Sequence, residues 1–177
     1  MERITDDSRF CEAVRELEPT AYAVAWVLLR SNADCEDAMS AAVLRAYEKR
    51  AGLKNGASFR AWFLRILKNE AYNILRHRSR SVPLERLEAT ASPQPPDPAL
   101  AEALMKLPER QRVAVVLQAK GYSMSEIASI LRIPEGTVKS RLSRAREQLR
   151  KKMAVNGNIS GSGASNGQKG GRLDVQK

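Results

Sequence analysis

The chain has 177 residues, enough for one ordinary domain or two small ones. Its 30 lysines and arginines against 20 acidic residues give a formal net charge of +10, which favours a polyanionic partner, most often nucleic acid. A basic surface that only keeps the protein in solution is the plainer interpretation. Two cysteines far apart, Cys11 and Cys35, and one histidine, His77, do not make up a zinc ligand set, so we expect no metal and no cofactor.

The N-terminal segment and the apolar runs indicate where the protein acts. Residues 1–7 are polar and acidic, unlike a signal peptide. The longest apolar run, residues 21–29, is far shorter than a membrane span. We therefore expect a cytoplasmic protein with reduced thiols and no membrane insertion.

Residues 8–80 are rich in helix formers and apolar repeats, and they predict several helices. Pro19 can restart a helix, since proline suits a first helical turn. Asp34 can cap a helix that begins at Cys35.

A two-glycine loop at residues 52–57 precedes the last predicted helix of this segment, which Ser58 can cap and which runs to about Arg78. At about 100° per residue, its side chains separate into two opposite sides. One side holds Phe63, Leu67, Glu70 and Ile74, and the other holds Arg65, Lys68, Tyr72 and Arg76. The second set can neutralise phosphates and stack on an unpaired base, although a solvated surface with an ordinary tyrosine explains the pattern equally well. Trp62, beside this stripe, is more often a core residue than a contact.

Composition divides the rest of the chain into three parts. A proline-rich break at residues 92–98 predicts a flexible linker over 81–98, because proline does not continue a helix. Helical patterning returns over 99–153. Residues 154–177 are dominated by glycine, serine and asparagine, and predict a disordered tail. No alternating strand pattern competes, so the expected fold is all-α, with two small helical domains joined by a flexible linker.

The segment after the linker predicts a helix-turn-helix. Pro108 with Glu109 marks one helix start, and Gly121 ends that helix. Ser123 and Glu126 have the spacing of a capping box for the next short helix. A connection at residues 132–136 then leads into a helix over 137–149.

This last helix is apolar on one side and polar to basic on the other. Its apolar side holds Val138, Leu142, Ala145 and Leu149, and its outward side holds Ser140, Ser143, Arg144 and Glu147, flanked by Lys139, Arg141, Arg146 and Arg150. Such a helix can enter the major groove, with early residues on base edges and flanking cations on phosphates. Arg144 is the candidate for direct base readout, and Lys139 for a base or a phosphate. Two capped helices with a short turn favour this interpretation over a basic helix in an ordinary bundle.

These segments resemble the extracytoplasmic-function (ECF) sigma factors, the compact class of the sigma-70 family. The likeness to region 4 is carried by Leu107-Pro108 with Arg112, Gly121-Tyr122-Ser123 with Glu126-Ile127-Ala128, and Pro134 with Gly136-Thr137-Val138-Lys139-Ser140-Arg141-Leu142 and Arg144-Ala145-Arg146. Upstream, Asp34 with Glu36-Asp37-Ala38 is similar to region 2.2, and Phe59-Arg60-Ala61-Trp62 with Arg65-Ile66 and Asn69 to regions 2.3 and 2.4.

The resemblance implies region 2 at residues 8–80 and region 4 at 99–153. It implies a sigma factor without catalysis of its own, whose partners are core RNA polymerase and promoter DNA. Region 2 would dock on the polymerase and recognise and melt the −10 element, while region 4 would bind the −35 element. An anti-sigma factor is a further partner that the resemblance suggests.

The resemblance also assigns three sets of contact residues. The −35 set is Lys139, Ser140, Arg141, Ser143, Arg144 and Glu147; the −10 set is Asn55, Ser58, Arg65, Lys68, Asn69, Tyr72 and Arg76; the polymerase-docking set is Asp37, Ser40, Ala41 and Leu44. The docking segment departs from the family, which usually has a Gln-Glu pair and an aromatic where this chain has Ser40, Ala41 and Val43. At this segment the contacts with polymerase are therefore expected to differ from those of the family.

Two other functions compete with the sigma factor. A stand-alone helix-turn-helix regulator would bind an operator without polymerase, but it would need a ligand pocket, receiver domain or dimerisation helix where this chain has the Trp62 helix and its basic stripe. A nucleic-acid-processing enzyme lacks support, because the sequence has no carboxylate cluster, histidine pair, glycine-rich phosphate loop or nucleophile elbow.

Overall fold

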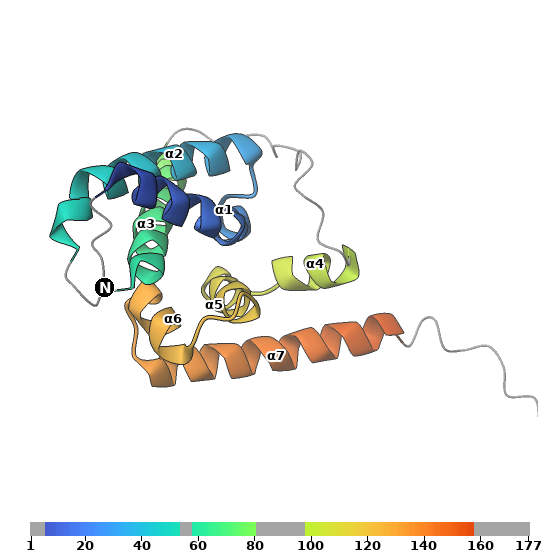
Figure 1. Cartoon of the computed structure of the whole chain (residues 1–177). Coiled ribbons are helices and arrows are strands. Elements are labelled where there is room, and N and C mark those ends of the chain that lie inside the picture. Colours follow the sequence, from blue (N-terminus) through green and yellow to red (C-terminus); the bar gives the residue numbers. More distant parts are fainter. Residues whose placement is uncertain (1–5, 54–57, 81–97, 158–177) are drawn as a thin grey trace, which may run out of the picture.

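The computed structural model describes residues 6–53, 58–80 and 98–157, and within these ranges all regular structure is helical. The elements, in chain order, are α1 (Asp7–Leu29), α2 (Asn32–Lys49), the 3-10 helix η1 (Arg50–Gly52), α3 (Phe59–Arg80), α4 (Pro98–Met105), α5 (Glu109–Ala119), α6 (Met124–Leu131) and α7 (Glu135–Gly157) (Figure 1). The absence of strands from these ranges agrees with the expected all-α class. The predicted linker (81–97 of it) and the tail from residue 158 onward lie outside the described residues.

The N-terminal unit consists of α1, α2 and α3, which pack on one another. The buried side of α2 carries only small residues, Cys35, Ala38, Ala42 and Ala46. Their spacing of three and four residues forms a narrow stripe along one side of the helix. Small side chains let α2 lie close to its neighbours, while α3 contributes the large core residues Phe63, Leu64 and Leu67.

The C-terminal unit contains the predicted helix-turn-helix. The Ser123 hydroxyl accepts from the Glu126 N–H at 3.2 Å, and the Glu126 carboxylate accepts from the Ser123 N–H at 2.9 Å, so the capping box is confirmed. Gly121 follows α5 at a φ of +82°, the left-handed conformation that glycine adopts without strain, and the chain reverses there. Arg132 ends α6 in the same conformation, at a φ of 55°, before α7 begins.

Two predicted helix starts are wrong. Pro19 lies inside α1 and does not restart a helix. Proline costs the helix one hydrogen bond, but the apolar residues on both sides of it, Leu17 and Ala21, are buried in one core, and that burial favours a continuous helix. Likewise α2 is capped by Ser31, whose hydroxyl accepts from the Asp34 N–H at 3.3 Å, so the helix begins three residues before Cys35.

The last helix also differs in length from its prediction. It begins at Glu135, two residues before the expected start, and continues to Gly157. The helical backbone therefore includes residues 154–157, which the sequence had assigned to the tail.

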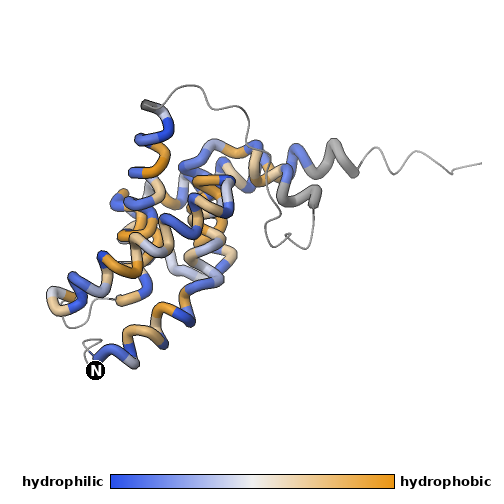
Figure 2. The backbone as a smooth tube through the Cα atoms, turned by 90° about the horizontal axis from the view of Figure 1, so that it is seen from above, coloured by the Kyte–Doolittle hydropathy of each residue, from blue (hydrophilic) through white to orange (hydrophobic). Residues whose placement is uncertain are grey.

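The two units pack against each other. Figure 1 shows α3 (green) reaching from α2 down to α6, with α5 below α1 and α7 along the base. The contacts are between α1 and α5 and between α3 and α6, and buried residues of both units belong to one hydrophobic cluster. Figure 2 shows hydrophilic and hydrophobic stretches alternating along the helices, as expected where each helix buries one side.

Among the described helices, none is both long enough and apolar enough to cross a membrane.

Candidate nucleic-acid interface

The outward side of α7 is open to solvent. Val138, Leu142 and Ala145 are fully buried, and this packing directs the opposite side of the helix away from the protein. Four of the six residues predicted for the −35 element are exposed: Lys139, Ser143, Arg144 and Glu147. The side of the helix predicted to enter a groove is therefore accessible in this structure.

The other two predicted −35 residues are partly covered. The Ser140 hydroxyl donates to the Thr137 carbonyl at 3.0 Å, so its proton is used within the helix. Arg141 is half-buried and lines a pocket between the two units. Arg146, beside them, donates to the Gln118 side chain at 2.9 Å and so ties α7 to α5.

Glu147 carries the acidic charge of this side. Its carboxylate pairs with Lys151 at 2.7 Å, one turn further along α7. That hydrogen bond and the charge of the lysine hold the pKa of Glu147 below its ordinary value, so the group is ionised at neutral pH and able to accept a hydrogen bond.

The predicted −10 residues on α3 have a different environment. Ser58, Asn69 and Arg76 are exposed and Arg65 is half-buried, while Asn55 lies outside the described residues. Lys68, however, is only 8% exposed. Its Nζ donates to the Ile130 carbonyl of α6 at 3.1 Å.

Burial and positive neighbours act together on Lys68. Burial lowers the pKa of its amine, and the nearby guanidinium groups of Arg132 and Arg65 lower it further. Each of these causes disfavours the charged form. The amine therefore lies among like charges, and no carboxylate of the described residues forms an ion pair with it.

Tyr72 is half-buried against the C-terminal unit. Its hydroxyl lies near the Glu109 carboxylate, and burial together with this carboxylate raises the pKa of the phenol, which is therefore neutral. Its ring lines a pocket of about 260 Å³ with Lys68, Arg110, Val113, Leu131, Ile133 and Arg141. The sequence predicted an outward stripe here, and the structure places α5, α6 and α7 over part of it.

The opposite side of α3 is fixed to α1 and α2 by polar contacts. The buried Glu70 carboxylate pairs with Arg45 of α2 at 3.0 Å and accepts from the Asn73 amide at 3.1 Å. Arg78 pairs with Asp34 at 2.6 Å and donates to the Leu29 carbonyl at 3.4 Å. These contacts set the orientation of α3 and hence the direction of its basic side.

The four predicted docking residues share one open side of α2. All four are exposed: Asp37, Ser40, Ala41 and Leu44. The Leu44 side chain is 62% exposed, which is a high fraction for a leucine. Tyr47, one turn on, is 38% exposed. Large exposed apolar side chains on one helix are a common sign of a protein contact surface.

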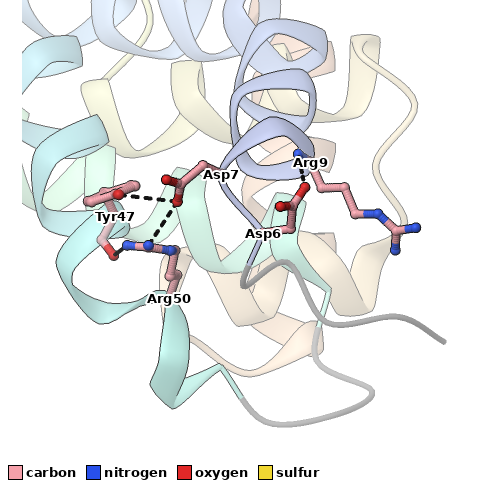
Figure 3. Close-up of polar contacts among 5 residues, drawn as sticks. All are labelled: Asp6, Asp7, Arg9, Tyr47 and Arg50. Atoms are coloured by element: carbon pink, nitrogen blue, oxygen red, sulfur yellow. Dashed lines mark hydrogen bonds and ion pairs between the residues drawn. The ribbon is translucent and has the colours of Figure 1, made fainter.

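A polar brace at the end of α2 was missed by the sequence reasoning. Asp7 Oδ1 accepts from the Tyr47 hydroxyl at 3.1 Å and from Arg50 Nη2 at 2.9 Å (Figure 3). The Arg50 guanidinium also stacks over the Tyr47 ring, 3.5 Å from its centroid. Because these residues are 40 and more positions apart from Asp7, no local pattern predicts the contact. The brace ties the start of α1 to the end of α2.

No cluster of three or more potential metal ligands occurs in the described part of the chain.

Comparison with known proteins accounts for both units. The Sigma-70 region 2 family matches residues 13–81, and the Sigma-70 region 4 family matches residues 98–149. The ECF RNA polymerase sigma factor SigM of Mycobacterium tuberculosis is 34% identical over 152 residues, which cover 81% of this chain and 76% of the relative. EcfG of Rhodopseudomonas palustris is 34% identical over 143 residues, covering 74% and 78%.

Solved structures agree. The sigma factor RpoE of Bartonella quintana, in complex with the anti-sigma factor NepR, matches with a TM-score of 0.71 at 29% identity and covers 83% of this chain and 98% of that one. CnrH, in complex with the cytosolic domain of CnrY, matches with a TM-score of 0.65 over 85% and 91% of the two chains; at 22% identity it supports the fold alone.

The two region matches, in the order region 2 then region 4, define a protein of the sigma-70 class. Within that class the chain belongs to the ECF RNA polymerase sigma factors, as the sequence had indicated. As a sigma factor, it directs RNA polymerase to initiate transcription at promoters.

Proposed function

We propose that this sigma factor binds the −35 element with the outward side of α7, binds the −10 element with α3, and docks on core polymerase through α2. The single observation that carries the proposal is the exposed basic side of α7, held outward by the buried Val138, Leu142 and Ala145.

On α7, Arg144 reads a base and Lys139 binds a base or a phosphate. Arginine reaches guanine with two hydrogen bonds in the major groove, which makes it the commonest specific reader. The exposure of both side chains supports the assignment. The ionised Glu147 is suited to accept from a cytosine amino group, and Ser140, Arg141 and Ser143 complete the set.

On α3, Arg65, Lys68 and Arg76 hold the backbone of the opened strand while the Tyr72 ring stacks on a base. Ser58 and Asn69 supply neutral hydrogen-bonding groups on the same helix. Asn55 belongs to the preceding loop in the same proposal. A flipped base is cheapest to take where stacking is already lost, as in a melting promoter.

On α2, Leu44 is the apolar anchor of the contact with polymerase. Around Leu44 the contact surface contains Asp37, Ser40 and Ala41. The exposure of Leu44 supports this assignment, since a buried apolar anchor contributes more to an interface than polar rim residues do. The same proposal places the chain in the cytoplasm with the polymerase. An anti-sigma factor is a further proposed partner, supported by the similarity to RpoE of Bartonella quintana, which was solved in complex with the anti-sigma factor NepR.

The decisive experiment mixes the purified full chain with core polymerase and a library of promoter fragments. We expect a stable complex and promoter-dependent transcripts. Failure to form both would overturn the proposal. DNA binding without a polymerase complex would instead identify a stand-alone regulator.

Polymerase docking is tested with Leu44→Asp, matched by Ala33→Asp, which puts the same charge at another exposed position of α2. Leu44→Asp should weaken the complex with core polymerase at least tenfold, while Ala33→Asp should not. Equal affinity of the two variants would place the docking surface elsewhere.

The role of α3 is tested with Tyr72→Ala and Tyr72→Phe. Loss of the ring should slow promoter opening more than it weakens closed-complex binding, and the phenylalanine variant, which keeps a ring, should retain opening. An equal loss in both steps with Tyr72→Ala would rule out stacking.

A further inference from the structure

Two large apolar side chains are exposed next to each other on α2. Leu44 and Tyr47 are the exposed large hydrophobic residues of the part of the chain that the structure describes. They are three positions apart, so their side chains lie on the same side of the helix, one turn from each other. The docking surface proposed for polymerase includes Leu44 and stops one turn before Tyr47. Tyr47 therefore extends that surface toward the end of α2.

The Tyr47 side chain is held in place from three directions. Its hydroxyl donates to Asp7 Oδ1 at 3.1 Å, and the Arg50 guanidinium lies over one face of its ring, 3.5 Å from the centroid (Figure 3). The buried Phe10 of α1 contacts the ring edge-on, with 5.5 Å between the two centroids. Because rotation of the Tyr47 side chain would break these contacts, the exposed ring is held in one orientation.

Arg50 connects the parts of this brace. Its Nη1 donates to the Tyr47 carbonyl at 2.7 Å, and its Nη2 donates to Asp7 Oδ1 at 2.9 Å. One guanidinium group therefore fixes Asp7 together with the ring and the backbone of Tyr47. A lysine at this position would keep the charge, but it would lack the flat group that stacks on a ring and donates from two nitrogens.

The brace is poorly placed to stabilise the fold. The Asp7 side chain is 68% exposed, and ion pairs that are open to water contribute little to the free energy of unfolding. The packing between α1 and α2 depends instead on buried apolar residues such as Phe10 and Ala46. Contacts that fix an exposed ring with little gain in stability indicate a role of that ring in binding.

We propose that Tyr47 is a further polymerase-contacting residue of this sigma factor, and that Asp7 and Arg50 are the residues that position its ring. These roles rest on the proposed docking of polymerase on α2, to which they add one contact and two positioning residues. Core polymerase is the occupant because Tyr47 continues the exposed side of α2 on which Leu44 lies.

The ring gains from positioning residues because immobilising a side chain costs affinity. Tyrosine is among the residues that contribute most to protein interfaces. A side chain that becomes fixed only on binding weakens the complex, whereas one already fixed does not. For one side chain this cost corresponds to about a two- to tenfold change in the dissociation constant. Loss of Asp7 should therefore weaken polymerase binding by this factor, and loss of the Tyr47 ring should weaken it more.

The first test measures the affinity of the full chain for core polymerase. Tyr47→Ala should weaken the complex at least tenfold, and Tyr47→Phe, which loses only the hydroxyl contact, should weaken it less. Lys49→Ala is the control, because Lys49 is exposed and lies nearly opposite Tyr47 around the axis of α2. Equal affinity of Tyr47→Ala and the wild type would overturn the inference.

The second test compares two neighbouring carboxylates at the start of α1. Asp6 accepts from the Arg9 N–H at 3.3 Å and caps α1, whereas Asp7 accepts from Tyr47 and Arg50 (Figure 3). Asp6→Ala should lower the free energy of unfolding and leave polymerase affinity unchanged. Asp7→Ala should cost less stability but weaken the polymerase complex about two- to tenfold. If the affinities of the two variants instead follow their stabilities, the brace is only structural and the inference is wrong.

The third test determines whether Asp7 and Arg50 act through the ring. The Tyr47→Ala variant has no ring to position, so adding Asp7→Ala to it should have no further effect on polymerase affinity. Arg50→Lys should likewise weaken the complex in the wild type and not in Tyr47→Ala. Additive losses in the double variants would exclude a positioning role.

The Leu44→Asp variant separates the role of Tyr47 from the proposed docking surface. If Leu44→Asp weakens the complex and Tyr47→Ala does not, polymerase docks on α2 without Tyr47, and only the inferred role of Tyr47 is wrong. If both variants bind as tightly as the wild type, the docking surface lies elsewhere and both proposals are wrong.

Discussion

The two helices proposed to contact the promoter, α3 and α7, are both long, basic and apolar on one side, yet they differ in what lies over the basic side. On α7 that side faces solvent, with Arg144 and Lys139 exposed. On α3 the corresponding side packs against α6, and Lys68 is nearly inaccessible. Helical periodicity determines which side of a helix packs within its own unit, but it does not determine what another unit lays over the remaining side.

The two surfaces also differ in their electrostatic environment. Lys139 and Arg144 of α7 are exposed to water, where the repulsion between charges is weak. Lys68 of α3 lies beside Arg132 and Arg65, and burial and these neighbours lower its pKa. The basic side of α7 is thus open to DNA. The basic side of α3 is held against the C-terminal unit by apolar packing, in spite of the repulsion between its cations and Arg132.

The largest expected effect tests whether the two units are one folding unit. Phe63→Ala in α3 and Leu142→Ala in α7 each remove a fully buried side chain. Phe63→Ala should lower the free energy of unfolding by about 3–5 kcal/mol, and Leu142→Ala should lower it by about 2–5 kcal/mol. Because the cluster spans both units, each variant should unfold in a single transition, followed in urea by circular dichroism and by Trp26 and Trp62 fluorescence. Leu142→Met is the control and should cost less than about 1.5 kcal/mol. Two separate transitions would mean that the covered and open surfaces belong to independent folding units.

The next effect concerns base readout on the open surface. Arg144→Ala should cost about 1–3 kcal/mol of discrimination at one position of the −35 element, because a two-pronged contact with a base is lost. Binding to a duplex library with every single substitution measures this, with Lys120→Ala, an exposed cation at the end of α5, as the control. A loss that is equal for all sequences would identify Arg144 as a phosphate contact.

A smaller effect concerns α6, which carries the carbonyl that holds Lys68. Ser123→Ala removes the cap of this helix and should destabilise the chain by about 0.5–2 kcal/mol in urea. Ser129→Ala, at an exposed position later in α6, should have little effect. A silent Ser123→Ala would show that tertiary packing alone holds α6 over α3.

The capping box also makes stability depend on pH. Hydrogen bonds from Ser123 lower the pKa of Glu126. The folded state therefore favours the ionised carboxylate, and this stabilisation is present at neutral pH and lost as the pH falls below the ordinary glutamate pKa of about 4.3. The difference in unfolding free energy between the wild type and Ser123→Ala should shrink on acidification, and a constant difference would contradict this origin.

The smallest effect concerns the two thiols of the N-terminal unit. Burial raises the pKa of the Cys35 thiol to about 11, whereas Cys11 is exposed. At about pH 8 a thiol reagent should modify one cysteine at once and the second only as fast as the unit opens, because the thiolate is the reactive form. Cys11→Ala should abolish the fast phase. Rapid reaction of both thiols would mean that α2 separates readily from α1 and α3.

The same raised pKa fixes the sign of an alkaline effect. The folded state favours the protonated Cys35 thiol, so this contribution is present below the ordinary thiol pKa and is lost as the pH rises through about 11. The Cys35→Ala variant should lack this part of the pH dependence.

Much of the C-terminal unit was predictable because its signals are local. The Ser123–Glu126 box, the turn at Gly121 and the inward side of α7 each depend on residues within a few positions of one another, and each was confirmed. The helical class followed in the same way from periodicity.

The predictions that failed depended on distant residues. Pro19 was a valid helix start by local rules, but the core on both sides of it favours a continuous α1. Asp34 was a valid cap, but its carboxylate pairs with Arg78, and Ser31 caps α2 instead. The cover over Lys68 and Tyr72, and the brace of Asp7, Tyr47 and Arg50, join segments that no local pattern relates.

The clamp at the end of α3 has a mechanical consequence. Arg78 grips Asp34 at the start of α2 and the last carbonyl of α1, two residues before α3 ends. The two contacts join the last turns of α3 to both other helices of the N-terminal unit. Fraying of α3 from its C-terminal end should therefore stop near Arg78, and the helical turns that precede Arg78 should keep their shape.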